Sequence, residues 1–179
     1  IDFNRAGTPL IEIVSKPDMH SAKEAAAYVD TLRKNLLYLN VSDVKMEEGS
    51  MRCDVNISLS EDKDTLGTKT EIKNLNSIAN VQKAVQAEIE RQSALLDAGE
   101  KVEQATRRYD EAQKTTILMR KKEGNVDYKY FPEPNIFPIQ LDLDWVESIQ
   151  DNLEELPDAR IARFMKVFEL SEYDAGVLV

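Results

Sequence analysis

The sequence predicts an α+β fold, with a mixed domain over residues 1–140 followed by the start of a small all-α domain over residues 141–179. Three observations predict it. Apolar and polar residues alternate over 51–59 and 68–74, which indicates strands. Apolar residues recur at helical spacing over 21–39 and 77–98, which indicates amphipathic helices. After residue 141 only short helical patterns remain.

Composition narrows the class of protein. The chain has 179 residues, of which 42% are hydrophobic, enough for a core. Its net charge of −10 argues against a module that wraps nucleic acid by itself and permits a divalent-cation site. Cys53 and His20 are the only residues of their types, which excludes an internal disulfide, a cysteine metal cluster and a histidine-rich site.

Simple sequence patterns predict where the protein is located in the cell and whether the chain is part of a longer protein. Nothing resembles a membrane span or a signal peptide, so we expect a cytoplasmic protein without membrane association. The chain lacks an initial methionine and ends within a helical pattern, so we expect an internal piece of a longer protein.

The first half of the chain predicts a strand, a helix and a hairpin. Residues 8–14 read as a buried strand rich in β-branched side chains. A capping box from Ser21 to Glu24 opens a helix that runs to about residue 39. The alternating segments 51–59 and 68–74 then form an antiparallel hairpin around a turn-rich loop.

The second half predicts one long helix, a strand pair and three short helices. Asn76 or Ser77 caps the long helix, and Gly99 ends it. Residues 104–110 and 115–120 form the strand pair, and the proline-rich stretch 127–138 is extended and irregular. Beyond residue 141, one helix carries Trp145 and Ile149, another opens at Pro157 with residues 161, 164, 167 and 168 inward, and a third is capped by Ser171.

Three carboxylates are candidates for a metal site. Glu12 lies inside the apolar segment, where an unpaired charge is costly. Asp54 and Glu71 lie on the polar faces of two strands that we expect to pair. Carboxylate oxygens converging on a sheet face suit Mg²⁺, the usual partner of ATP phosphates. Ion pairs offer an equally simple explanation. Arg5 would pair with Glu12, and Arg52, Lys69 or Lys73 would pair with Asp54 and Glu71.

Other clusters are ambiguous. Glu47 and Glu48 precede a Gly-Ser turn and either join a metal shell or form a charged loop. Lys73 and Asn74 either bind a phosphoryl group or belong to a strand-to-helix turn. The basic residues at 107, 108 and 120–122 either contact RNA phosphates or form solvated surface, and the aromatic residues at 128, 130 and 131 either stack a base or anchor a loop.

The opening IDFNRAGTPLIEI at residues 1–13 resembles the signature of the B-type subunit of the tRNA-dependent glutamyl/aspartyl amidotransferases. Four further blocks follow in the same order, and a short ELP block comes last: MEEGS at 46–50, RCDVN at 52–56, EIKNLNS at 71–77, DYKYFPEP at 127–134 and ELP at 155–157. The resemblance therefore covers essentially the whole chain.

The resemblance implies a fold, a reaction and a set of partners. It implies the C-terminal part of a catalytic cradle similar to glutamine synthetase. It implies a ligase that uses ATP and Mg²⁺ to phosphorylate the side-chain carboxylate of Glu-tRNA(Gln) or Asp-tRNA(Asn). An A-type amidase subunit releases ammonia, with glutamine as one amido donor, and a small C-type subunit completes the heterotrimer. Ammonia then displaces phosphate.

The same resemblance assigns residues. It implies that Glu12, Asp54 and Glu71 are catalytic metal ligands and that Arg52, Lys73 and Asn74 contribute to cofactor binding. Further ligands of the family lie outside this chain, so we expect the chain by itself to be inactive. Two alternatives stay open: a scaffold that docks the partner amidase and forms the ammonia channel, and a related enzyme that activates a different carboxylate. The choice between glutamine and asparagine also stays open.

Overall fold

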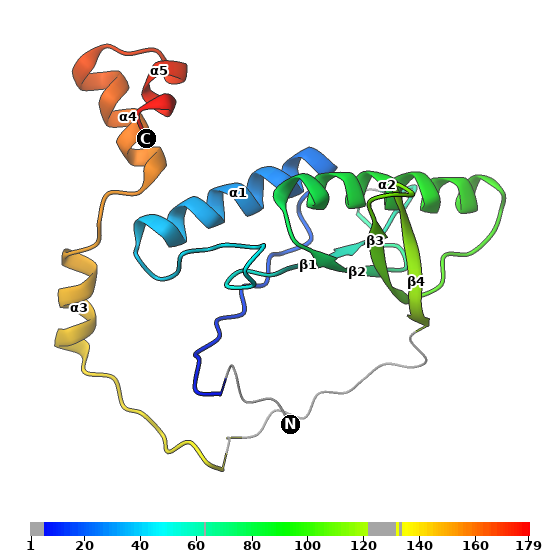
Figure 1. Cartoon of the computed structure of the whole chain (residues 1–179), viewed down its shortest axis with the longest axis horizontal. Coiled ribbons are helices and arrows are strands. Elements are labelled where there is room, and N and C mark those ends of the chain that lie inside the picture. Colours follow the sequence, from blue (N-terminus) through cyan, green and yellow to red (C-terminus); the bar gives the residue numbers. More distant parts are fainter. Residues whose placement is uncertain (1–5, 63, 122–131, 133) are drawn as a thin grey trace.

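Two long helices lie across one face of a four-stranded sheet, and no helix of the described residues covers the other face (Figure 1). The computed structural model describes residues 6–62, 64–121, 132 and 134–179. Arg5, Lys122 and the aromatic residues at 128, 130 and 131 therefore lie outside the described residues. No helix in these ranges is long and apolar enough to cross a membrane.

The sheet has the strand order β1-β2-β3-β4. Strands β1 and β2 pair antiparallel, β2 and β3 pair parallel, and β3 and β4 pair antiparallel. The parallel pair needs a long crossover, which the second helix, α2, supplies between β2 and β3. Both predicted strand pairs are confirmed, and the bounds are β1 Cys53–Ile57, β2 Thr70–Leu75, β3 Ala105–Asp110 and β4 Thr115–Lys121.

The two long helices are α1, Ala22–Tyr38, and α2, Ile78–Asp97, as predicted. The Ser21 hydroxyl accepts a hydrogen bond from the backbone N–H of Glu24 at 3.1 Å, and the Glu24 carboxylate accepts one from His20 N–H at 2.6 Å. Ser77 caps α2 in the same way, accepting from the N–H of Asn80 at 3.1 Å. These caps satisfy amide groups that the first turn of a helix leaves unpaired.

The core lies between the helices and the inner face of the sheet. Ile72 is fully buried on β2, and Val81 and Ala84 of α2 pack against it. Val29 of α1 and Met46, from the loop before β1, complete the cluster. The alternation in β1 and β2 thus buries its apolar side against α2, as the pattern predicts.

A buried polar network connects α2 to strands β3 and β4. Glu88 is fully buried and accepts hydrogen bonds from Arg91, from Thr116 of β4 at 2.7 Å and from Gln92 at 2.9 Å. Arg107 of β3 lies 3.7 Å from the same carboxylate and donates to the Thr116 hydroxyl at 2.8 Å. Because each charge has donors or acceptors around it, the network offsets the cost of its burial.

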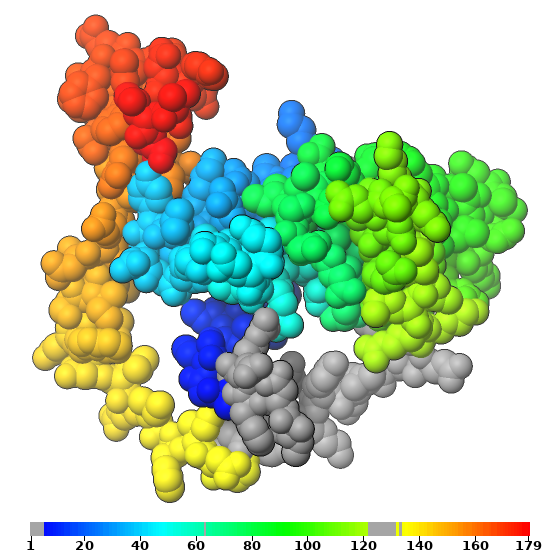
Figure 2. Space-filling model, viewed as in Figure 1, coloured from blue at the N-terminus to red at the C-terminus, as the bar shows by residue number. Residues whose placement is uncertain are grey.

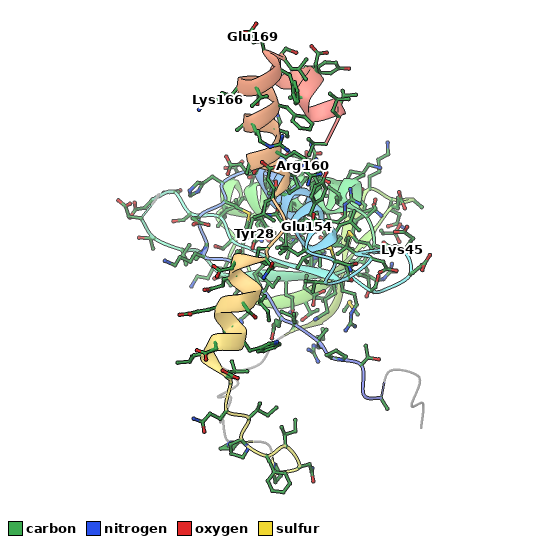
Figure 3. All side chains as sticks on the ribbon, turned by 90° about the vertical axis from the view of Figure 1, so that its left-hand side faces the viewer. Tyr28, Lys45, Glu154, Arg160, Lys166 and Glu169 are labelled. Carbon is green, nitrogen blue, oxygen red and sulfur yellow. The ribbon has the colours of Figure 1, made fainter. Side chains whose placement is uncertain are left out.

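Three short helices follow, each where it was expected: α3 Leu143–Asp151, α4 Pro157–Phe168 and α5 Glu172–Val177. Helices α4 and α5 project from the sheet and long helices (Figure 2). Arg160 lies near the end of α4 that approaches α1, with its guanidinium 5.0 Å from the Tyr38 ring centre, whereas Lys166 and Glu169 lie toward the distal end (Figure 3). The prediction that residues 167 and 168 face inward was wrong, because both are more than half exposed.

Residues 8–14 do not form the predicted buried strand. The segment belongs to no strand, and Leu10 and Val14 are each 80% exposed. A strand needs a neighbour for its backbone groups and an apolar surface for its side chains. No described residue pairs with the segment, which explains why its strand pattern does not become a strand here.

Candidate site on the open face of the sheet

The sheet face away from α2 is polar, and the strand register determines which side chains share it. Asn56 of β1 lies opposite Glu71 of β2, and Glu71 lies beside Thr106 of β3. In the next row, Lys73 lies beside Arg108. We call these residues, with Asp54 and the β4 residue Arg120, the open face.

Lys73 lies at the centre of the acidic part of this face. Its Nζ is 2.7 Å from Asp54 Oδ2 and 3.1 Å from Glu71 Oε1. The second oxygen of Glu71, Oε2, accepts a hydrogen bond from the Thr106 hydroxyl at 3.0 Å. The sequence prediction that Asp54 and Glu71 share one face is therefore confirmed, and so is the alternative that Lys73 pairs with them.

A bulge in β2 produces this geometry. Cys53 pairs with Leu75 and Val55 with Ile72, so two residues of β2, Lys73 and Asn74, lie opposite Asp54 alone. Asn74 has a φ of 62°, a left-handed conformation that asparagine adopts more readily than most residues. Leu75, after the bulge, lies in the core, while Lys73 reaches across to Asp54 of β1.

The charges on the open face affect one another. The hydrogen bond from Lys73 to Asp54, together with the one to Glu71, raises the pKa of Lys73 above its ordinary value. Asp54 has 46% of its side chain exposed and Glu71 has 17%, so a ligand from solvent can reach Asp54 more easily than Glu71. Cys53, on the opposite face, is no nucleophile here, because burial and the Asp54 charge raise the pKa of its thiol to about 11.

The pair of carboxylates fits a magnesium ion that also binds phosphates. The Lys73 ammonium shows that a cation can lie between Asp54 and Glu71. Among the residues described, no three histidine, cysteine, aspartate or glutamate side chains gather as a metal group. Mg²⁺ commonly takes only one or two protein carboxylates and completes its shell with water and substrate phosphates. Two carboxylates are thus sufficient for that kind of site, although not for a closed protein cage.

Glu12 lies apart from this cluster in the described structure. It is an exposed residue of the unpaired segment 8–14, and no ion pair joins it to another described residue. The expectation that it lies inside a buried strand is wrong, for the reason given above for that segment. Its role as a third metal ligand stays a prediction from the resemblance.

The loop that carries Glu47 and the turn between β2 and α2 meet at a hollow of about 220 Å³. Glu47 and Lys45 line it from the loop, Asn76 and Ser77 from the start of α2, and Arg33 from α1. The Nε of Arg33 is buried there without a hydrogen-bond partner. Glu48 instead pairs with Lys45 at 2.9 Å, which agrees with its interpretation as part of a charged loop.

The remaining predicted cofactor residues lie at the edge of the open face. Arg52 precedes β1 and is exposed, and no ion pair connects it to the described part of the chain. Asn74 is exposed within the bulge. Sequence reasoning did not assign Thr106 or Arg33 to any site, because their places depend on the parallel register of β3 and on the packing of α1.

Known proteins resemble this chain over its full length. The family described as the GatB/GatE catalytic domain matches residues 1–147. The chain is 53% identical over 179 residues to the aspartyl/glutamyl-tRNA(Asn/Gln) amidotransferase B subunit of Moorella thermoacetica, 55% to that of Oceanobacillus iheyensis and 54% to that of Lactiplantibacillus plantarum. Each match covers 99% of this chain and 38% of the relative. The chain spans well under half the length of these relatives, and it belongs to the GatB/GatE catalytic domain family.

Proposed function

We propose that this chain is part of the catalytic subunit of a tRNA-dependent amidotransferase, and that its open face takes part in activating the substrate carboxylate. The substrate is Glu-tRNA(Gln) or Asp-tRNA(Asn). The cluster of Asp54, Lys73 and Glu71 carries the proposal, because it combines carboxylates and an ammonium on the sheet face that no helix of the described residues covers. The 53% identity to a protein named for this reaction supports it.

The reaction that we propose has two stages. A side-chain carboxylate is a poor electrophile, so its oxygen first attacks the γ-phosphorus of ATP, and ADP leaves. Ammonia from the partner amidase then attacks the acyl carbon and displaces inorganic phosphate, which leaves the amide on the tRNA. Mg²⁺ neutralises phosphate charge when bound.

The residues of the chain have separate tasks in this scheme. Asp54 and Glu71 hold the cation, and Thr106 orients Glu71 through its hydrogen bond. A cation bound there takes the place of the Lys73 ammonium, and Lys73 is then available to interact with a transferring phosphoryl group. Arg52 and Asn74 help to bind the cofactor from the edge of the face. Glu12, in the segment 8–14, is proposed as a further ligand of the metal.

A second candidate function rests on a different observation. Exposed apolar residues in segments 8–14 and 136–141 and on α3 favour a scaffold that docks the partner amidase and forms part of an ammonia channel. A scaffold does not need charge on the open face. The two candidates therefore differ in what they expect from neutral replacements of Asp54 and Glu71.

The test uses the full-length natural protein in complex with its amidase and small partner subunits, with Glu-tRNA(Gln) as substrate. We expect Asp54→Asn and Glu71→Gln to lower tRNA-dependent ATP cleavage and amide formation by about 100-fold or more. Glu61→Gln, an equal loss of charge in the exposed loop between β1 and β2, is the matched control and should retain activity. Assembly and tRNA binding should be unchanged in all three. Near-normal rates in Asp54→Asn and Glu71→Gln would reject the catalytic assignment and favour the scaffold.

A further inference from the structure

The open face has a cationic side as well as an acidic one. Thr106 and Arg120 are register partners on β3 and β4, and Thr106 donates to Glu71, so Arg120 shares the face with Glu71. Two strand spacings separate Arg120 from Glu71, about 10 Å between backbones. An arginine side chain directed along the face covers much of that gap.

Arg120 differs from the other cations of this face in having no ion-pair partner among the described residues. Lys73 contacts Asp54 and Glu71, and Arg108 lies 3.5 Å from Asp110. Within residues 6–62, 64–121 and 134–179, no carboxylate pairs with Arg120, and the residue is exposed. Its guanidinium is therefore accessible to a ligand from solvent.

We propose that Arg120 binds the phosphate groups of the nucleotide on the open face, an inference that rests on the proposed function above. A magnesium ion held by two carboxylates completes its shell with water and nucleotide phosphate oxygens, and those phosphates carry negative charge beyond the metal. Arg120 provides a planar pair of donors on the side of the face opposite Asp54. The acidic side thus holds the cation, and Arg120 holds the anion attached to it.

A nucleotide fits this arrangement better than the backbone of an RNA. The open face carries Asp54 and Glu71 on the strands beyond β3, and these carboxylates repel RNA phosphates that lack a bound metal. The net charge of −10 acts in the same direction. One arginine on the same face as two carboxylates is suited to a metal-bound polyphosphate.

The neighbour of Arg120 provides a matched control. Lys121 is the next residue on β4, so it projects from the opposite face, and its Nζ pairs with Glu103 at 2.6 Å. Arg120→Ala and Lys121→Ala remove equal charge from the same strand. Arg120→Lys keeps the charge and removes the paired donors.

The experiment measures equilibrium binding of Mg·ATP and, separately, of uncharged tRNA to the full-length natural protein in complex with its partners. We expect Arg120→Ala to raise the Kd for Mg·ATP by about 10- to 100-fold, Arg120→Lys to raise it less, and Lys121→Ala to leave it unchanged. The Kd for tRNA should be the same in all variants.

Three results would overturn the inference. If Arg120→Ala binds Mg·ATP as wild type does, only the role of Arg120 is rejected, and the proposed function stays in place. Loss of tRNA binding with normal Mg·ATP binding assigns Arg120 to RNA instead. If the wild-type complex itself does not bind Mg·ATP, both this inference and the proposed function are rejected.

Discussion

The body formed by the sheet, α1 and α2 uses its apolar residues differently from the segments on either side of it. Ile72 and Val81 are fully buried in the body, whereas Leu10 and Phe137 in the flanks are 80% and 89% exposed. The residue types are equally apolar in both regions. The difference shows that a hydrophobic pattern gives a segment the capacity to be buried, while burial itself requires a second layer to cover it.

The largest effect should come from the buried network of the body. Glu88→Ala removes the acceptor of Arg91, Gln92 and Thr116 and leaves the half-buried Arg107 without its carboxylate. We expect the free energy of unfolding to fall by about 3–5 kcal/mol, measured by urea denaturation. Glu88→Gln, which keeps an acceptor and the side-chain shape, should cost less. An unchanged midpoint for Glu88→Ala would show that the network contributes little.

Glu88 also makes the body sensitive to acid. Burial raises the pKa of Glu88, but the hydrogen bonds from Arg91, Thr116 and Gln92 outweigh it and lower the pKa below its ordinary value of 4.5. A lowered pKa in the folded state means that the charged form stabilises the protein above about pH 4.5 and that this contribution is lost as the pH falls through the folded pKa. Wild type should therefore lose more stability than Glu88→Gln as the pH is lowered below about 4.5, which urea denaturation over a pH series measures.

A smaller effect should separate the core from the flanks directly. Ile72→Ala leaves a cavity in a closed core, and we expect it to cost about 2–5 kcal/mol of unfolding free energy. Leu10→Ala removes an exposed side chain, and we expect a change within about 0.5 kcal/mol. Denaturation of both variants in the same buffer measures the contrast. Equal costs would show that segment 8–14 is covered after all in solution.

The smallest effect concerns the attachment of the helical segment. Arg160→Ala removes the contact between α4 and the Tyr38 ring of α1. Loss of a cation–π contact of about 0.5–1 kcal/mol should then raise the rate of proteolytic cleavage at residues 152–156 by a factor of about 2 to 5. Arg163→Ala is the control, because Arg163 pairs with Glu155 as Arg160 does but stacks on Phe164 within α4 itself. A faster rate in both variants would point to a weaker helix rather than to lost docking.

Local signals in the sequence were sufficient for most of the fold. The capping residues Ser21 and Ser77 begin their helices as predicted, and the alternation around Asp54 places it on the polar face with Glu71. These signals work because each depends on neighbours within a few residues or on one adjacent strand. The prediction of a strand at residues 8–14 was wrong, because a strand there needs a pairing partner that the described residues do not supply.

The candidate site could be predicted only in part, for the same physical reason. Arg107 and Arg108 read as one basic pair in the sequence, yet alternation places Arg107 in the buried network and Arg108 on the open face. Thr106 and Arg120 come to the face only through the parallel pairing of β2 with β3 and the bulged pairing of β3 with β4. Strand order and register are properties of the whole sheet, and a single-strand pattern does not contain them.

The bulge at Asn74 can be considered in terms of insertion and deletion. Without Asn74, Ile72, Lys73 and Leu75 would alternate as in a regular strand, and the core would keep both apolar side chains. The hydrophobic frame of β2 therefore does not need this residue, and a single-codon deletion at this point leaves that frame intact. What the deletion would alter is the polar side, where Lys73 and Asn74 now stand together opposite Asp54. We therefore expect the loss of Asn74 to change the polar contacts of the open face and to leave the core unchanged.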